Sequence, residues 1–194
     1  VGIKPTPSIG GVGLIKDYKK MVTMDFKKID NLVLVIGKTE GHIDQSLFAR
    51  SILDEKNGPP PEVNLFNEKN NGESLLDLIN KDYIQSAHDI SLGGLITAIS
   101  KMCIQGNKGI KLKKANNFVN ELEYLFCEDQ GRYIIEIKPE DLKEVTNLLD
   151  KNSVHYDELG IITDKEMIIN QKTKLTIDEL KSYYTNWLTN YMSA

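Results

Sequence analysis

Cysteine is scarce in this sequence, with only Cys103 and Cys127 among its 194 residues. Two cysteines exclude a framework of several disulfide bridges, and no C-x-x-C pair or Cys/His cluster predicts a zinc site. Both cysteines lie in apolar contexts, Lys-Met-Cys-Ile and Leu-Phe-Cys-Glu. We therefore expect two buried free thiols.

An excess of basic residues is also missing. Lys and Arg number 24 and Asp and Glu number 28, so the net charge is −4. Because nucleic-acid binding needs a basic face, we expect no nucleic-acid partner. No apolar run approaches the roughly 18 residues that a membrane span requires, and no signal peptide opens the chain. We therefore expect no membrane partner and a cytoplasmic location.

Two glycine motifs in the first 40 residues are incomplete. Gly37-Lys38-Thr39 follows an apolar run, but Leu32 stands where a P-loop would need its first glycine. The pair Gly11 and Gly13 lacks the third glycine of a dinucleotide fingerprint. The sequence therefore predicts a simple turn after the first strand rather than a nucleotide site.

Strands alternate with helices from residue 32 onward. The run Leu32-Val33-Leu34-Val35-Ile36, ended by Gly37, predicts a strand buried on both faces. Thr176 is expected to cap the helix predicted at 177–191, and Ser91 is expected to cap the helix predicted at 92–105. The pattern predicts strands at 32–36, 84–87, 110–112, 132–137, 154–162 and 166–169, and helices at 45–53, 72–81, 92–105, 118–124, 139–150 and 177–191. We expect an α/β fold, a sandwich of one mixed sheet with packed helices, in which the last two strands form a hairpin.

The first 31 residues have a different composition. Prolines at positions 5 and 7 and glycines at 10, 11 and 13 leave room only for a short edge strand, and few apolar residues are available for burial. The chain starts at Val1 rather than Met, as an excised piece would. We expect residues 1–31 to be the terminal strand and linker of a preceding, absent domain, and 32–194 to be one domain.

A first candidate site follows the predicted strand 84–87. His88 and Asp89 precede Gly93 and Gly94, which fall in the first turn of a predicted helix. Glycines there permit either close packing of helix against sheet or the approach of a ligand phosphate to free N–H groups. Adjacent residues of an extended chain point to opposite faces, so a mutual His88–Asp89 pair is unfavourable geometrically. Packing and ligand contact both remain open.

A second candidate site is Glu128-Asp129-Gln130-Gly131-Arg132, directly before the strand 132–137. It places two carboxylates, an amide and a guanidinium between an apolar segment and a buried strand. The composition is compatible with a binding or interface role and equally with a structural one. Two adjacent acids do not form a closed Mg²⁺ ligand set.

Several segments, in this order, resemble the end of the formylglycinamidine ribonucleotide synthase family. They are Pro5-Thr6-Pro7-Ser8-Ile9-Gly10-Gly11-Val12-Gly13-Leu14, Ile36-Gly37-Lys38-Thr39-Glu40-Gly41-His42, Ala87-His88-Asp89-Ile90-Ser91-Leu92-Gly93-Gly94-Leu95, Leu125-Phe126-Cys127-Glu128-Asp129-Gln130-Gly131-Arg132-Tyr133 and Leu159-Gly160. The resemblance spans nearly the whole chain. It implies the fold of the C-terminal domain of aminoimidazole ribonucleotide (AIR) synthase, here the second such domain of the enzyme.

The resemblance also implies a function for the parent protein. That family makes an amidine from formylglycinamide ribonucleotide with ATP, Mg²⁺ and glutamine-derived ammonia, in purine biosynthesis. Its catalytic half would be absent here, so this chain is expected to hold no catalytic residue and no cofactor. Its expected partners are the absent N-terminal domains and the glutaminase and small accessory subunits. By internal duplication, Glu128-Asp129-Gln130 resembles a Glu-Ser-Gln substrate contact of the first half, and Asp129 in place of Ser would disfavour a substrate phosphate.

Two alternatives remain beside this interpretation. One is the C-terminal domain of another enzyme of the same superfamily, such as AIR synthase, selenophosphate synthetase or the hydrogenase-maturation dehydratase. The other is a freestanding module that binds a small molecule or a protein. The candidate contact residues are the same in each case: Glu128, Asp129, Gln130, Arg132, His88 and Asp89.

Overall fold

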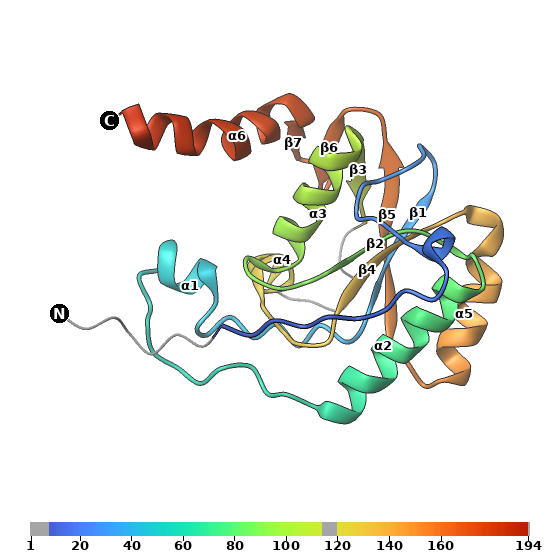
Figure 1. Cartoon of the computed structure of the whole chain (residues 1–194). Helices are drawn as coiled ribbons and strands as arrows, with labels where there is room; N and C mark the ends of the chain where they lie inside the picture. The colour runs from blue at the N-terminus through green and yellow to red at the C-terminus, as the bar shows by residue number, and fades with distance from the viewer. Residues whose placement is uncertain (1–7, 114–119, 194) are drawn as a thin grey trace.

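The structure, a computed structural model, describes residues 8–113 and 120–193. Helices and strands alternate along the chain (Figure 1). The strands are β1 (Leu32–Ile36), β2 (Ile84–Asp89), β3 (Gly109–Leu112), β4 (Tyr133–Ile137), β5 (Tyr156–Thr163), β6 (Glu166–Ile169) and β7 (Thr173–Thr176). The helices are α1 (Leu47–Ser51), α2 (Leu65–Asn80), α3 (Gly94–Gly106), α4 (Glu121–Phe126), α5 (Leu142–Lys151) and α6 (Ile177–Ser193), with 3-10 turns η1 (Tyr18–Lys20) and η2 (Pro139–Asp141).

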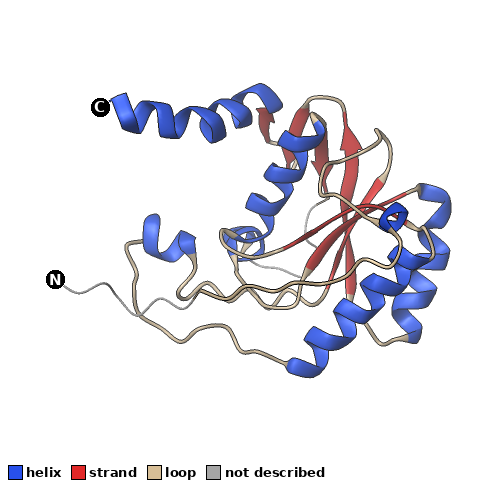
Figure 2. Ribbon diagram, in the orientation of Figure 1, coloured by secondary structure: helices blue, strands red, loops and turns tan. Residues whose placement is uncertain are grey.

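The strands form one mixed sheet in the order β2-β4-β1-β5-β3-β6-β7. Neighbouring strands are antiparallel except β3 and β6, which are parallel. Helices cover both faces, with α3, α4 and α6 over one and α2 and α5 over the other (Figure 2). The predicted α/β class is confirmed. None of the helices in the described part of the chain combines the length and apolar character needed to cross a membrane.

Strand β1 lies near the middle of the sheet and contributes side chains to both layers of the core. Val33 and Val35 belong to the cluster under α3, while Leu34 and Ile36 belong to the cluster under α2 and α5. All four side chains are fully buried. The prediction of a strand buried on both faces is confirmed, because alternate side chains of a strand point to opposite faces.

The hairpin predicted for the strands 154–162 and 166–169, which correspond to β5 and β6, is wrong; β6 instead pairs antiparallel with β7. β3 lies between β5 and β6 and pairs with both. The chain therefore arches over the start of β3, where the Gly109 N–H donates to the Asp164 carbonyl at 3.0 Å. A Cβ atom on Gly109 would lie 2.1 Å from the Glu166 carbonyl oxygen. Only glycine permits this close passage, and hydrophobic periodicity carries no signal of it.

Several helix boundaries differ from the predicted ones. α2 begins at Leu65 rather than 72, because the Asn64 side chain caps it by accepting the Asn67 N–H at 3.0 Å. α3 begins after Gly93, whose φ is +86°, so Ser91 is not its cap. Thr176 does cap α6: its hydroxyl accepts the Glu179 N–H, and the Glu179 carboxylate accepts the Thr176 N–H.

Some predicted features lie partly or wholly outside the described residues. These are the extended segment 1–7 and residues 118–119 of the helix predicted at 118–124; α4 begins at Glu121, after its cap Asn120, and runs to Phe126. Residues 8–16 contain no strand, so the short edge strand expected there is absent from this segment. β7 was not expected from the sequence.

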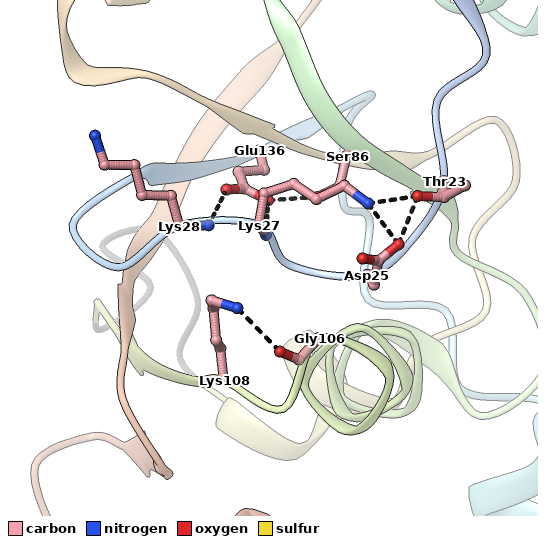
Figure 3. Close-up of polar contacts among 8 residues, drawn as sticks. All are labelled: Thr23, Asp25, Lys27, Lys28, Ser86, Gly106, Lys108 and Glu136. Carbon is pink, nitrogen blue, oxygen red and sulfur yellow. Dashed lines mark hydrogen bonds and ion pairs between the residues drawn. The ribbon is translucent and has the colours of Figure 1, made fainter.

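Residues 22–31 lie against the sheet and are held there by a buried carboxylate on β4 (Figure 3). Glu136 is 0% exposed. Its oxygens accept the N–H groups of Lys27 at 2.8 Å and Lys28 at 3.0 Å, the Asn31 side-chain amide at 2.7 Å and the Ser86 hydroxyl at 2.8 Å. Phe26 fills the adjacent core. The division of the chain at residue 32 remains a prediction, and these contacts make 26–31 part of the folded unit physically.

Replacing Glu136 by Gln tests this anchor. An amide keeps one acceptor oxygen and turns an NH₂ group toward donors, so we expect the free energy of unfolding to fall by about 2–3 kcal/mol. Urea denaturation followed by circular dichroism measures it. The exposed Glu140→Gln is the matched control and should change stability by less than about 0.5 kcal/mol; equal effects of the two changes would contradict the anchor.

Candidate functional site

The segment 127–132 connects α4 to β4 and contacts two other loops of the chain. One is the loop 38–42 that follows β1, and the other is the turn 90–94 that precedes α3. The second candidate site of the sequence therefore lies where three connections meet. Its polar side chains point into these connections.

Asp129 is 5% exposed, and its carboxylate is surrounded by backbone donors of the first loop. One oxygen accepts the N–H groups of Glu40 at 2.7 Å and Gly41 at 3.0 Å, and the other accepts the His42 N–H at 3.1 Å. Gly41 has a φ of +85°, which lets three successive N–H groups converge on one anion. The Asp129 carboxylate thus occupies a place that would otherwise suit an external oxyanion.

Glu128 joins two helix beginnings. Its Oε1 accepts the Leu47 N–H of α1 and the Gly93 N–H before α3, each at 2.8 Å. Gly94 has a φ of +71°, and a Cβ atom there would lie 2.7 Å from the Cys127 carbonyl oxygen. Gly94 therefore permits the close packing of α3 against the segment 125–128, whereas a Cβ atom on Gly93 would lie 2.4 Å from Thr97 Oγ1 of α3 itself.

Arg132 is 1% exposed and closes the segment on itself. Its guanidinium donates to the carbonyls of Cys127 at 2.8 Å and Asp129 at 3.2 Å, and to the Thr39 hydroxyl at 3.2 Å. Gln130, by contrast, is exposed and donates to the Glu128 carbonyl at 3.2 Å. Of the four candidate side chains here, Asp129 and Arg132 are buried, Glu128 is partly buried and Gln130 is exposed.

His88 and Asp89 end strand β2 at the edge of the sheet. The His88 Nδ1 lies 3.1 Å from the Asp89 carboxylate, so the sequence argument against a mutual pair is wrong. That expectation assumes that neighbouring side chains of a strand point to opposite faces of the sheet. Asp89 is the last residue of β2, and its exposed side chain can turn toward His88 at the edge of the sheet. The His88 Nε2 is buried and has no hydrogen-bond partner in the described part of the chain. The structure places the pair one residue from Ile90, whose N–H donates to the Arg132 carbonyl.

A polar hollow of about 460 Å³ lies beside Asp129 and Gln130. Its walls come from the loop 38–42, residues 61–64, the first half of α2 and the segment 129–131. Three carboxylates, those of Glu40, Glu62 and Glu68, line it beside Asp129, and Lys38 is ion-paired to Glu40 at 2.7 Å. This charge balance disfavours a phosphate. No group of three or more His, Cys, Asp or Glu residues suited to a metal ion occurs within 8–113 and 120–193.

Sequence reasoning missed Glu136 and the backbone donors of residues 40–42. Glu136 had a detectable signal, because it is a lone charged residue in a strand that is otherwise apolar on both faces. The donors of 40–42 had none, since backbone N–H groups are the same in every residue.

Comparisons with known proteins agree with the resemblance noted in the sequence. Residues 28–170 match the family described as AIR synthase related protein, C-terminal domain. A phosphoribosylformylglycinamidine synthase subunit PurL of Pelagibacter ubique is 69% identical over 192 residues, which is 99% of this chain and 26% of that protein. The PurL of Bartonella henselae is 39% identical over 190 residues, again 26% of its length. The chain thus spans about a quarter of the length of these relatives.

Solved structures support the fold alone. Thermotoga maritima PurL complexed with FGAR has a TM-score of 0.69 at 16% identity, covering 84% of this chain and 30% of that one. Escherichia coli HypE, a hydrogenase maturation protein, has a TM-score of 0.57 at 13% identity, covering 80% of this chain and 51% of that one. The second likeness shows that the fold is shared beyond one enzyme.

Replacing Asp129 by Asn tests the role of its carboxylate. Asn keeps the shape but offers one acceptor oxygen to three N–H donors, so we expect a loss of about 2–3 kcal/mol in the free energy of unfolding. Hydrogen exchange of the amides 40–42 should accelerate at the same time. Gln130→Ala, at the exposed neighbour, is the control; unchanged exchange at 40–42 in Asp129→Asn would refute the assignment.

The two thiols give a prediction on reactivity. Both cysteines are free and buried, as expected. Burial raises the pKa of the Cys127 thiol to about 11 and also raises that of Cys103. Only the thiolate is nucleophilic, so iodoacetamide at pH 8 should alkylate the folded chain at least tenfold more slowly than the urea-unfolded chain. Mass spectrometry of timed samples measures this, and fast labelling of the folded chain would contradict the burial.

Proposed function

The chain belongs to the family of AIR synthase related proteins, C-terminal domain, and from this premise we propose that it is a non-catalytic domain of a phosphoribosylformylglycinamidine synthase. The parent enzyme would convert formylglycinamide ribonucleotide to its amidine in purine biosynthesis, with ATP and Mg²⁺ bound elsewhere in the polypeptide. The proposal is supported by the relatives, which are phosphoribosylformylglycinamidine synthase subunits, one of them 69% identical along nearly all of this chain.

The observation that carries the non-catalytic role is the use of the polar residues at the candidate site. The carboxylates of Glu128 and Asp129 accept five backbone N–H groups, and the Arg132 guanidinium donates to three oxygens of the chain itself. A general acid, base or nucleophile needs a group that can reach substrate. The carboxylates of Glu128 and Asp129 and the guanidinium of Arg132 are occupied within the chain, which supports a scaffold and interface role.

The partners follow from the same proposal. We infer that the chain contacts the N-terminal domains of its parent, together with the glutaminase and small accessory subunits of a cytoplasmic complex. Residues 1–31 would connect it to a preceding domain, and the contacts of 26–31 with Glu136 would hold that connection against the sheet. His88 and Asp89, at the edge of the sheet, remain candidates for contact with a neighbouring domain.

An assay with the isolated chain tests the proposal. With formylglycinamide ribonucleotide, ATP, Mg²⁺ and ammonia we expect no amidine from the chain alone. Adding the remaining part of the Pelagibacter ubique subunit, without the region that this chain matches, should give ATP-dependent amidine formation. The release of ADP measures the reaction.

Two results would overturn the proposal. One is turnover by the chain alone, which would require a catalytic site within these residues. The other is a dissociation constant below 1 µM for a nucleotide or phosphoribosyl compound, measured by calorimetry on the chain alone, combined with no activity in the mixture. That result would favour a freestanding binding module.

A further inference from the structure

Helix α6 begins in the core and then leaves it. Ile177 is 1% exposed, and Leu180 packs against the cluster under α3. Beyond these residues α6 projects away from the sheet and from α3 (Figure 1). The helix is 17 residues long, so most of its turns lie past the last core contact.

The apolar face of α6 continues without a break into the projecting part. Tyr184, Trp187, Leu188 and Tyr191 follow Ile177 and Leu180 at spacings of three or four residues, which puts them on one face of the helix. They are 59%, 65%, 58% and 68% exposed. The opposite face carries Ser, Thr and Asn, so the helix stays amphipathic beyond Leu180, where no residue of 8–113 or 120–193 buries its apolar face.

Charge is missing from the same stretch. After Lys181 no Asp, Glu, Lys or Arg occurs in residues 182–193. A solvated helix end normally carries charges, whereas the buried centre of a protein interface is depleted of them and enriched in Tyr and Trp. A helix that lies on a membrane surface carries Lys and Arg on its polar face, and α6 has none there. The composition therefore favours a protein partner with an apolar, weakly charged surface.

The exposed face is large enough to matter energetically. Large aromatic side chains bury roughly 150–250 Å² each, so the three aromatic side chains of this face, together with Leu188, expose several hundred Å². Monomeric proteins rarely leave a contiguous apolar patch of that size uncovered. Trp187 and Tyr191 are already stacked, with ring centroids 5.5 Å apart, so part of the surface is pre-ordered.

We propose that the face formed by Tyr184, Trp187, Leu188 and Tyr191 docks onto another domain of the same polypeptide. The inference rests on the proposed function, under which this chain is one part of a longer enzyme. The relatives are nearly four times as long as the stretch they share with this chain, so they contain ample chain to supply the covering surface. That surface must offer apolar contact and acceptors for the Tyr hydroxyls and the Trp187 Nε1–H.

Trp187 is the only tryptophan in the chain and reports on this face directly. The chain is labelled with 5-fluorotryptophan and mixed with the unlabelled remainder of the Pelagibacter ubique subunit. We expect the ¹⁹F resonance to shift and broaden on complex formation. Leu188→Asp should weaken association more than tenfold, because it buries an unpaired charge. Thr189→Asp, which adds the same charge on the polar face, should change association less than twofold.

The outcomes separate this inference from the proposed function. Amidine formation in the mixture with an unshifted ¹⁹F signal would overturn the docking of α6 and leave the proposed function standing. A ¹⁹F signal that shifts with the concentration of the labelled chain alone would identify a second copy as the occupant and also overturn it. Equal weakening by Leu188→Asp and Thr189→Asp would do the same. Circular dichroism of both variants checks that α6 still forms.

Discussion

The carboxylate of Asp129, enclosed by the N–H groups of Glu40, Gly41 and His42, determines how the loops at this end of the sheet are arranged. A buried charge is tolerable only when oriented dipoles replace the water it has lost, and three converging N–H groups provide them. The Glu128 carboxylate likewise accepts backbone N–H groups, at the beginnings of α1 and α3. Both carboxylates come from one short segment, and Arg132 fixes the shape of that segment through its carbonyls. Charge-assisted bonds to backbone N–H groups therefore hold the loop 38–42 and the turn 90–94, and Ile90 of that turn also packs in the core.

The same physics holds the N-terminal segment in place. Glu136 is a buried carboxylate on a central strand, and its four partners come from residues 27–31 and from β2. Glu136 fixes residues 27–31 to the sheet, and Asp129 and Glu128 fix the loop 38–42 and the beginnings of α1 and α3 to the segment that precedes β4. A fold of this kind presents firmly positioned loops to its surroundings, which suits a domain whose proposed task is support and contact.

The candidate site and helix α6 present different surfaces. The candidate site uses its polar groups internally, while one face of the projecting part of α6 exposes Tyr184, Trp187, Leu188 and Tyr191. Tyr and Trp on an uncharged helix face indicate contact with protein, and the much greater length of the relatives provides a source for it. A scaffold role and an unpartnered helix face are thus two aspects of one interpretation.

The sequence by itself determined the class of the fold and most of its regular elements. The run Leu32–Ile36, the strand before Pro139 and the Thr176 cap were visible because periodicity and capping are local properties. The order of the five segments quoted above also sufficed to place the chain in its family. What only the tertiary structure decided was non-local: β3 inserted between β5 and β6 over Gly109, His88 turned toward Asp89, and Asp129 bound by the N–H groups of a loop 87 or more residues earlier. Backbone donors and close approaches leave no mark on residue type at the distant partner, which is the physical reason why the sequence could name the candidate residues but not their contacts.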